Sequence, residues 1–472
     1  MRFIDIYLGE LREKIILVLS SILLLVSLNI FSQVKEEWVA IYNGPGNGQD
    51  WAEDIAVDEE GNVYVTGYSY GSGTGSDCTT IKYNSNGLEQ WVARYNGPDN
   101  GADNGLDLVL DNETNVYVTG YSYGSGTDSD YITIKYNNAG EEQWVARYNG
   151  SKNIRDCACD MVVDNNGNIY VTGYTNYTYP GDPTDCATIK YDKNGVEQWV
   201  AEYNGPVNGK DATLAIALDY DGNVYVTGGS EFSENNQDYI TIKYNGLGVE
   251  QWMARYNGLG NGGDSASAIV LDSKGNVYIT GRSTGLETAV DYATVKYNNS
   301  GVEQWVARYN GPQNGVDRAL AIALDSDENV CITGYINLTY DGYYGYYTDY
   351  ATIKYDSNGL EQWVAIYNGN GNLDDRAYDI CTDKEGNIYV TGYGYVSNIV
   401  GQIDYATIKY NKIGTEQWVA TYSLFYGSSN WACAITVDSK NNVYVTGVCL
   451  NYRDYVTIKY SQNTFSESFY LY

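Results

Sequence analysis

The stretch DWAEDIAVDEEGNVYVTGYSYGSGTGSDCTTIKYNSNGLEQWVARYNG, from Asp50 to Gly97, contains the pattern that decides the fold. It divides into four short runs rich in Val, Ile, Thr, Tyr and Trp, at residues 50–58, 62–68, 77–84 and 89–96. Gly, Asn or Asp bounds each run, which is typical of β-strands joined by tight turns. The stretch therefore predicts a unit of four consecutive strands, numbered strand 1 to strand 4.

This unit recurs along the chain with a nearly constant period. The segment WVAxYNG, or a close variant of it, begins at eight tryptophans: Trp38, Trp91, Trp144, Trp199, Trp252, Trp305, Trp363 and Trp418. The intervals between them are 53, 53, 55, 53, 53, 58 and 55 residues. A period near 50 residues with four strands in each unit is typical of the blades of a β-propeller.

The two ends of the repeat region predict how the ring closes. The first Trp segment, Trp38–Tyr42, precedes any strand 1, and the last TIKY segment, Thr457–Tyr460, has no Trp segment after it. We therefore expect the N-terminal strand to complete the eighth blade, which removes the exposed edge of an open array. The predicted fold is all-β, a single eight-bladed propeller over about residues 36–460, with a short tail at 461–472.

The repeat resembles the bacterial SBBP repeat, a family named for a seven-bladed beta-propeller. The likeness is carried by AIALDSDENVCITG (Ala321–Gly334) and DYATVKYNNSGVEQW (Asp291–Trp305). The resemblance implies a propeller on an exported bacterial protein and implies little about activity. The number of units differs, because this chain has eight rather than seven.

The N-terminal residues predict export. Lys14 precedes an apolar run from Ile15 to Phe31, and Ser32 then offers a small residue at a plausible cleavage point. This is the arrangement of a secretory signal peptide, here residues 1–32. The alternative is an uncleaved anchor, but a run of 17 residues is short for a span of about 20. We expect a secreted or cell-envelope protein with no transmembrane span after cleavage.

Composition excludes several classes of function. Against 28 Lys and Arg stand 60 Asp and Glu, so the formal charge is −32, which argues against nucleic acid as a partner. The chain has no histidine, which excludes Ser-His-Asp catalysis and imidazole metal ligands. We therefore predict a binding protein without a cofactor rather than an enzyme.

One alternative is a purely structural propeller of the envelope or matrix. Another is a hydrolase or lyase that uses a carboxylate pair near the central channel, such as Asp107 and Asp160.

Loop lengths distinguish the two faces of the predicted ring. Only the loop between strands 2 and 3 varies, with 9, 9, 11, 9, 9, 14, 11 and 6 residues from blade 1 to blade 8. In an up-and-down blade these loops share a face with the connections from strand 4 to the next strand 1. Loops on a rigid scaffold often carry binding function, although neutral drift favours the same positions. We predict that this variable face binds the ligand.

Tyrosines crowd two of these variable loops. Exposed Tyr offers a flat apolar face with a polar edge, which suits an extracellular polysaccharide or a surface protein. Arg318 and Arg376, near the starts of adjacent strands 1, could bind a carboxylate on the same face. The alternative is that Tyr is simply the favoured β-residue of this repeat. The predicted ligand-binding tyrosines are Tyr174, Tyr177 and Tyr179 in the 11-residue loop of blade 3 and Tyr340, Tyr343, Tyr344, Tyr346 and Tyr347 in the 14-residue loop Tyr335–Thr348 of blade 6.

Three aspartate series repeat around the ring. Those at the end of strand 1 and the start of strand 3 occur in every unit and are interpreted as structural. Every unit also has a lysine in strand 3, for which we expect one of these carboxylates as a partner. The third series enters strand 1, where its oxygens suit Ca²⁺ if they surround the channel mouth, with turn capping as the alternative. Its members are Asp50, Asp103, Asp156, Asp211, Asp264, Asp317 and Asp375, with Asn430 in the eighth unit.

Overall fold

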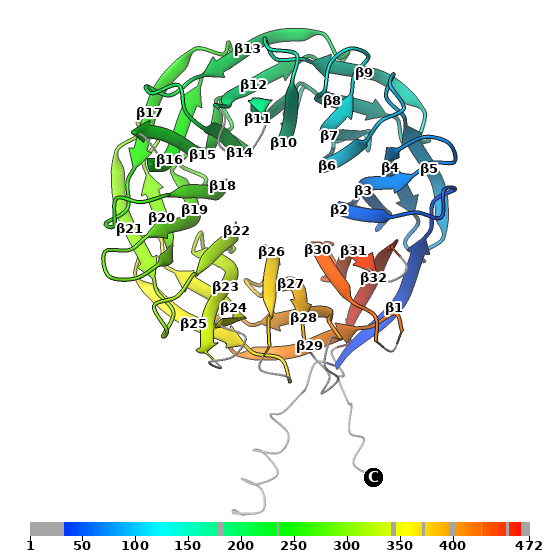
Figure 1. Cartoon of the computed structure of the whole chain (residues 1–472). Coiled ribbons are helices and arrows are strands. Elements are labelled where there is room, and N and C mark those ends of the chain that lie inside the picture. The colour runs from blue at the N-terminus through cyan, green and yellow to red at the C-terminus, as the bar shows by residue number, and fades with distance from the viewer. Residues whose placement is uncertain are drawn as a thin grey trace, which may run out of the picture.

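The computed structural model describes residues 33–177, 183–233, 236–340, 346–370, 373–395, 402–425, 427–449 and 453–463. In these ranges 32 strands form eight four-stranded antiparallel sheets arranged as a ring (Figure 1). The predicted all-β, eight-bladed propeller is confirmed. The predicted signal peptide and the end of the tail lie outside the described residues. No helix in the described ranges is long and apolar enough to cross a membrane.

Each of blades 1 to 4 contains four strands that are consecutive in sequence. They are β2 (Asp50–Val57), β3 (Val63–Tyr70), β4 (Ser76–Tyr83) and β5 (Glu89–Tyr95); β6 (Asp103–Leu110), β7 (Val116–Tyr123), β8 (Ser129–Tyr136) and β9 (Glu142–Tyr148); β10 (Arg155–Val163), β11 (Ile169–Tyr177), β12 (Asp185–Tyr191) and β13 (Glu197–Tyr203); β14 (Asp211–Leu218), β15 (Val224–Ser233), β16 (Asn236–Tyr244) and β17 (Glu250–Tyr256).

Blades 5 to 7 repeat this order, and blade 8 combines the two ends of the chain. Their strands are β18 (Ser265–Leu271), β19 (Val277–Thr284), β20 (Val290–Tyr297) and β21 (Glu303–Tyr309); β22 (Arg318–Leu324), β23 (Val330–Tyr340), β24 (Tyr346–Tyr355) and β25 (Glu361–Tyr367); β26 (Arg376–Thr382), β27 (Ile388–Gly394), β28 (Asp404–Tyr410) and β29 (Glu416–Tyr422); β30 (Asn430–Val437), β31 (Val443–Cys449), β32 (Asp454–Asn463) and β1 (Gln33–Tyr42).

The ring closes as predicted. Strand β1 pairs antiparallel with β32, with Ala40 opposite Thr457, and the sheet order is β1-β32-β31-β30. Figure 1 shows β1, in blue, beside β32, in red. This pairing gives the backbone of β32 hydrogen-bond partners that the open edge of a linear array would lack.

The aspartate at the end of strand 1 holds the hairpin to strand 2. In blade 1, Asp58 Oδ1 accepts hydrogen bonds from the backbone N–H groups of Glu60 (3.0 Å) and Asn62 (2.8 Å). The hydroxyl of Tyr64 donates to the other carboxylate oxygen at 3.1 Å. The corresponding aspartate accepts backbone bonds in every blade. This series is therefore turn chemistry, as the sequence predicts.

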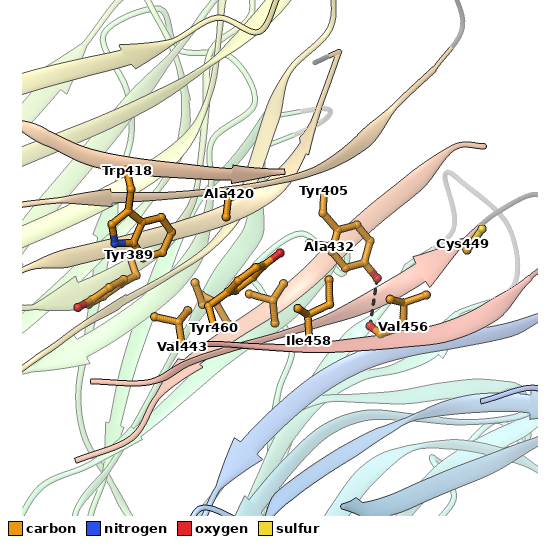
Figure 2. Close-up of a cluster of buried hydrophobic side chains, with 12 residues drawn as sticks. Tyr389, Tyr405, Trp418, Ala420, Ala432, Val443, Cys449, Val456, Ile458 and Tyr460 are labelled. Atoms are coloured by element: carbon orange, nitrogen blue, oxygen red, sulfur yellow. Dashed lines mark hydrogen bonds between the residues drawn. The ribbon is translucent and has the colours of Figure 1, made fainter. Parts of the chain in front are cut away.

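Apolar side chains of neighbouring blades form the cores between them. Between blades 7 and 8, Tyr389 and Trp418 lie with Val443, Ile458 and Tyr460 in one buried cluster (Figure 2). Fully buried tyrosines keep their hydroxyls bonded across the interface; Tyr405, for example, donates to the carbonyl of Val456 at 3.2 Å. These tyrosines are thus core residues with a satisfied polar end. In the described ranges the buried hydroxyls at the end of strand 3 have no hydrogen-bond partner in Tyr83, Tyr136, Tyr297 and Tyr460.

In blades 4 and 6 the strand-3 lysine pairs with the aspartate at the end of strand 1 of its own blade. Lys354 lies 2.5 Å from Asp325, and Lys243 lies 3.8 Å from Asp219. In blades 1 to 5, 7 and 8 the ammonium also lies 4.7–5.2 Å from the ring centroid of the strand-2 tyrosine. The expected carboxylate partner is therefore found in blades 4 and 6, where it is not the aspartate that opens strand 3, while the lysines of blades 1, 3, 5 and 8 bond backbone carbonyl oxygens.

Blade 6 differs from its sequence-based prediction in one respect. The expected loop Tyr335–Thr348 is largely a continuation of the hairpin, because β23 and β24 remain paired from Asn337 opposite Thr348 to Tyr340 opposite Tyr346. The β-favouring residues Ile336, Thr339 and Tyr340 explain why the strands extend. Tyr340, Tyr346 and Tyr347 consequently lie in strands.

Candidate functional site

Strand 1 of every blade lies nearest the centre of the ring (Figure 1). It begins opposite the end of strand 2, as Asp50 opposite Ser69 shows, and the loops between strands 2 and 3 emerge at this end. The connections between blades lie there too, since the N–H of Gly75 in a 2–3 loop donates to the carbonyl of Asn100 in such a connection. The variable loops therefore share one face with the connections, and this variable face is the place to look for a site.

The aspartates that enter strand 1 connect the loops of that face. Asp50 accepts from the N–H of Gly44 at 2.6 Å and from the N–H of Tyr70 at 3.0 Å, so it joins the connection before strand 1 to the end of strand 2. All seven aspartates are fully buried, and each lies in a separate blade. Burial raises the pKa of Asp156, Asp317 and Asp375 to about 6. In the described ranges no group of three or more Cys, Asp or Glu side chains is placed to hold a metal ion.

The residue after this aspartate, with its partner in strand 2, forms what we call the inner rim. In blades 1 to 8 the pairs are Trp51–Tyr68, Asn104–Tyr121, Cys157–Tyr174, Ala212–Gly229, Ser265–Arg282, Arg318–Tyr335, Arg376–Tyr393 and Trp431–Val448. Only blades 6 and 7 share the same pair. The inner rim therefore breaks the symmetry of a repeat that is otherwise nearly uniform, and symmetry breaking is what a specific site requires.

Aromatic side chains of the inner rim meet across blade boundaries. Trp431 of blade 8 stacks on Tyr393 of blade 7, with ring centroids 5.3 Å apart and planes at 20°. Trp51 of blade 1 meets Trp431 edge to face at 5.7 Å. The guanidinium of Arg376 lies 4.7 Å from the ring centroid of Tyr335. Aromatic groups thus follow the rim continuously from blade 6 through blade 8 to blade 1.

A cavity of about 240 Å³ opens between blades 2 and 3 on the variable face. The predicted residues Tyr174 and Tyr177 lie in it, with ring centroids 5.9 Å apart. Flat rings beside a few polar groups are typical of a ligand pocket. The complete lining is Ala102, Tyr121, Tyr123, Ser129, Arg155, Cys157, Tyr174 and Tyr177.

The other predicted tyrosines contribute less to the described structure. Tyr179, Tyr343 and Tyr344 lie outside the described residues. The backbones of Tyr340 and Tyr346 pair with each other, but their side chains also lie outside. Tyr347 is half-buried and its backbone pairs with Thr339. Among the described residues, the structure brings Tyr174 and Tyr177 of blade 3 together.

The two predicted arginines have different surroundings. Arg376 already has partners within the protein. Besides Tyr335, its side chain contacts the hydroxyl of Thr348 at 3.2 Å and lies 3.9 Å from Asp374. Arg318 forms no ion pair with a carboxylate of the described residues, and Arg282 is a charged neighbour. Sequence analysis missed Arg282 and the aromatic residues Trp51, Tyr335, Tyr393 and Trp431. Comparing the repeat units position by position would have shown them, because they stand where the repeat varies most.

Three carboxylates follow the strand-1 bulges of blades 1 to 3. Asp54 accepts from the N–H of Leu108 (2.9 Å), Asp107 from that of Met161 (2.7 Å) and Asp160 from that of Ile216 (2.8 Å). Each aspartate therefore connects its blade to the next one. Burial raises the pKa of Asp160 to about 6, and burial with the neighbouring Asp160 and Asp54 raises that of Asp107 well above its usual range. The row therefore retains protons at pH values where an exposed aspartate is ionised.

Fold and repeat together define this protein as an eight-bladed beta-propeller repeat protein. The family model for the SBBP beta-propeller repeat matches residues 37–73, 146–178, 251–286 and 362–399. The chain therefore contains SBBP repeats, in agreement with the resemblance noted in the sequence.

Other proteins show a more remote similarity to this chain. An uncharacterized WD repeat-containing protein of Acanthamoeba polyphaga mimivirus is 23% identical over 377 residues, which are 67% of this chain and 26% of the relative. This chain thus spans about a quarter of that protein. Among solved structures, a eukaryotic initiation factor is 8% identical over 88% of both chains, with a TM-score of 0.44. A puromycin hydrolase is 9% identical over 85% of this chain and 58% of its own, with a TM-score of 0.45.

Proposed function

We propose that this protein is an exported binding scaffold that holds an extracellular polysaccharide on its variable face. The observation that carries the proposal is the tyrosine-lined cavity between blades 2 and 3. Tyrosine rings offer apolar faces to sugar rings, while hydroxyl and guanidinium groups at the edge bond sugar hydroxyls. A volume of about 240 Å³ is below the roughly 300–1,000 Å³ usual for whole drug-sized ligands, which suits one or two sugar units of a longer chain.

A glycan array tests this proposal with the chain from Gln33 onward. Tyr123→Ala and Tyr177→Ala together remove two stacking faces, and we expect at least tenfold weaker binding. Tyr220→Ala is the matched control, because Tyr220 is 94% exposed in the hairpin after strand 1 of blade 4, on the opposite face. Equal losses in both variants would contradict a site on the variable face. An array without any binding would contradict the polysaccharide and favour a surface protein or a structural spacer.

The proposed binding needs no cofactor. Each strand-1 entry aspartate accepts a backbone hydrogen bond from the connection that precedes it, so we expect the same glycan affinity in Ca²⁺ and in EDTA. Loss of binding in EDTA would instead show that a cation is part of the site.

One observation favours a second candidate function, a hydrolase or lyase. Asp54, Asp107 and Asp160 form a row of carboxylates with raised pKa, and such groups can serve as acid and base. The backbone bonds of all three already give the row a structural role, so we place the enzyme second. Incubating a bound glycan with the protein separates the two functions. Cleavage products that disappear in Asp107→Asn would establish the enzyme.

A further inference from the structure

Two arginines of neighbouring blades lie next to each other on the inner rim. Arg282 is on β19 of blade 5, opposite Ser265, and Arg318 is on β22 of blade 6, opposite Tyr335. Strands β19 and β22 pack against each other, and both side chains are half-buried. Burial, and after it the charge of Arg318, lowers the pKa of Arg282, in keeping with their neighbouring positions on the packed strands.

Neither arginine forms an ion pair in the described ranges, although the charge of Asp264 acts on Arg282 from beyond ion-pair distance. The Nε of Arg318 is buried without a hydrogen-bond partner, and no carboxylate lies within ion-pair distance of either side chain in the described ranges. Arg453 is exposed. The remaining described arginines all pair with carboxylates: Arg94, Arg147, Arg155, Arg255, Arg308 and Arg376.

The chain has many carboxylates that could pair with these arginines, because it contains 60 Asp and Glu. Half-buried charges of the same sign without a counter-charge destabilise a fold, since desolvation and repulsion are not offset. A ligand with a negative group would supply the missing charge. Guanidinium forks match the planar geometry of a carboxylate and can bind it with paired hydrogen bonds.

We propose that Arg282 and Arg318 together bind one carboxylate of an acidic saccharide at the inner rim. This inference rests on the proposed polysaccharide function and adds the chemical class of the sugar. The aromatic part of the rim begins directly beside the pair, with Tyr335 opposite Arg318 and the Tyr393–Trp431 stack in the next two blades. A uronic acid bound through its carboxylate would thus have aromatic faces nearby for the neighbouring sugars.

The charge of the whole chain limits how acidic this saccharide is. A net charge of −32 repels a dense polyanion. Charges on the surface are screened beyond about 8 Å at physiological ionic strength, so a single carboxylate responds mainly to the arginine pair. The expected ligand therefore carries isolated uronic acids separated by neutral sugars.

Thermal melting with sodium glucuronate tests the pair without knowledge of the full ligand. Compared with sodium chloride at equal ionic strength, glucuronate should raise the Tm of the wild type and leave that of Arg282→Gln/Arg318→Gln unchanged. The double variant should melt no lower than the wild type in chloride, because repulsion is relieved. Lys152→Gln, which removes an exposed positive charge from the same face, should retain the glucuronate shift. Equal shifts in both salts, or a shift retained by the double variant, would overturn the inference.

A glycan array with matched pairs separates this inference from the proposed function. The members of each pair differ only in having glucuronate or glucose at one position. We expect at least tenfold tighter binding of the acidic member, and loss of that preference but not of neutral binding in Arg282→Gln/Arg318→Gln. Equal binding of both members would overturn the carboxylate site and leave the polysaccharide function standing. Binding of neither would overturn both.

Discussion

Blades 5 and 6 are neighbours with the same strand register, yet they differ at the outer part of the variable face. In blade 5, Arg308 lies opposite Ala293, and its guanidinium bonds Asp291 at 2.8 Å, the Ser283 hydroxyl at 2.6 Å and the Tyr256 hydroxyl at 2.9 Å. In blade 6 the position of Arg308 is taken by Ile366, opposite Ala351.

The aspartate of blade 6 is left without partners. Asp349 is 1% exposed, and neither of its carboxylate oxygens has a hydrogen-bond partner. Burial, and after it the charges of Asp375 and Asp374, raises its pKa to about 7. The position of Ser283 is also apolar in this blade, because Ile336 stands opposite Asp349. The comparison shows that the strand pairing does not depend on the arginine–aspartate pair.

The largest change in stability is expected when Arg308 of blade 5 is replaced by isoleucine, the residue at the same position of blade 6. Arg308→Ile removes the counter-charge of the buried Asp291, which then retains a hydrogen bond from the Thr288 hydroxyl, so we expect the free energy of unfolding at pH 8 to fall by about 3 kcal/mol. Chemical denaturation followed by tryptophan fluorescence measures the change. Arg155→Ile is the matched control, since its contact with Asp128 is exposed and should contribute less than about 1 kcal/mol. If both variants lost the same free energy of unfolding, the buried pair would contribute no more to stability than the exposed one.

The reverse exchange should stabilise blade 6. Ile366→Arg places a guanidinium near Asp349 and removes a side chain that is 39% exposed, so little burial is lost. We expect a gain of about 2 kcal/mol at pH 8, the scale of a hydrogen bond to a charged group. The same denaturation experiment at pH 3.5, where Asp349 is protonated, should show almost no gain. A gain of the same size at both pH values would mean that the arginine does not act through Asp349.

The smallest expected effect comes from removing the charge of Asp349 itself. The pKa of Asp349 rises from an ordinary 3.8 to about 7, so folding favours its protonated form. The wild type therefore loses stability as pH rises from about 4 through 7. Asp349→Asn cannot ionise, and above pH 7 it should be more stable than the wild type by about 1 kcal/mol. Melting curves between pH 4 and 8 test this, and a constant difference over that range would disprove the assigned titration.

Sequence reasoning was most successful where the interactions are local. The hairpin aspartates, such as Asp58, act within six residues of their own position, so their role follows from the pattern DxxGN. It was less successful where a side chain can contact several elements. The strand-3 lysine was expected to find a carboxylate, but only the structure shows that Lys354 uses Asp325. The tyrosines of blade 6 were placed in a loop, whereas Tyr340, Tyr346 and Tyr347 lie in strands.

The repeat pattern in the sequence is enough to specify the ring: the number of units, the four strands in each and the closure by the first strand. These features follow from short-range strand and turn preferences repeated every 50 or so residues, and from the way the two ends complement each other. Only the tertiary structure decided the inner rim. It brings Arg282 beside Arg318 and Trp51 beside Trp431, residues 36 and 380 positions apart, because each blade packs against the next. The alternation of a strand shows which side chains share a face, but the packing of blades decides which of them meet.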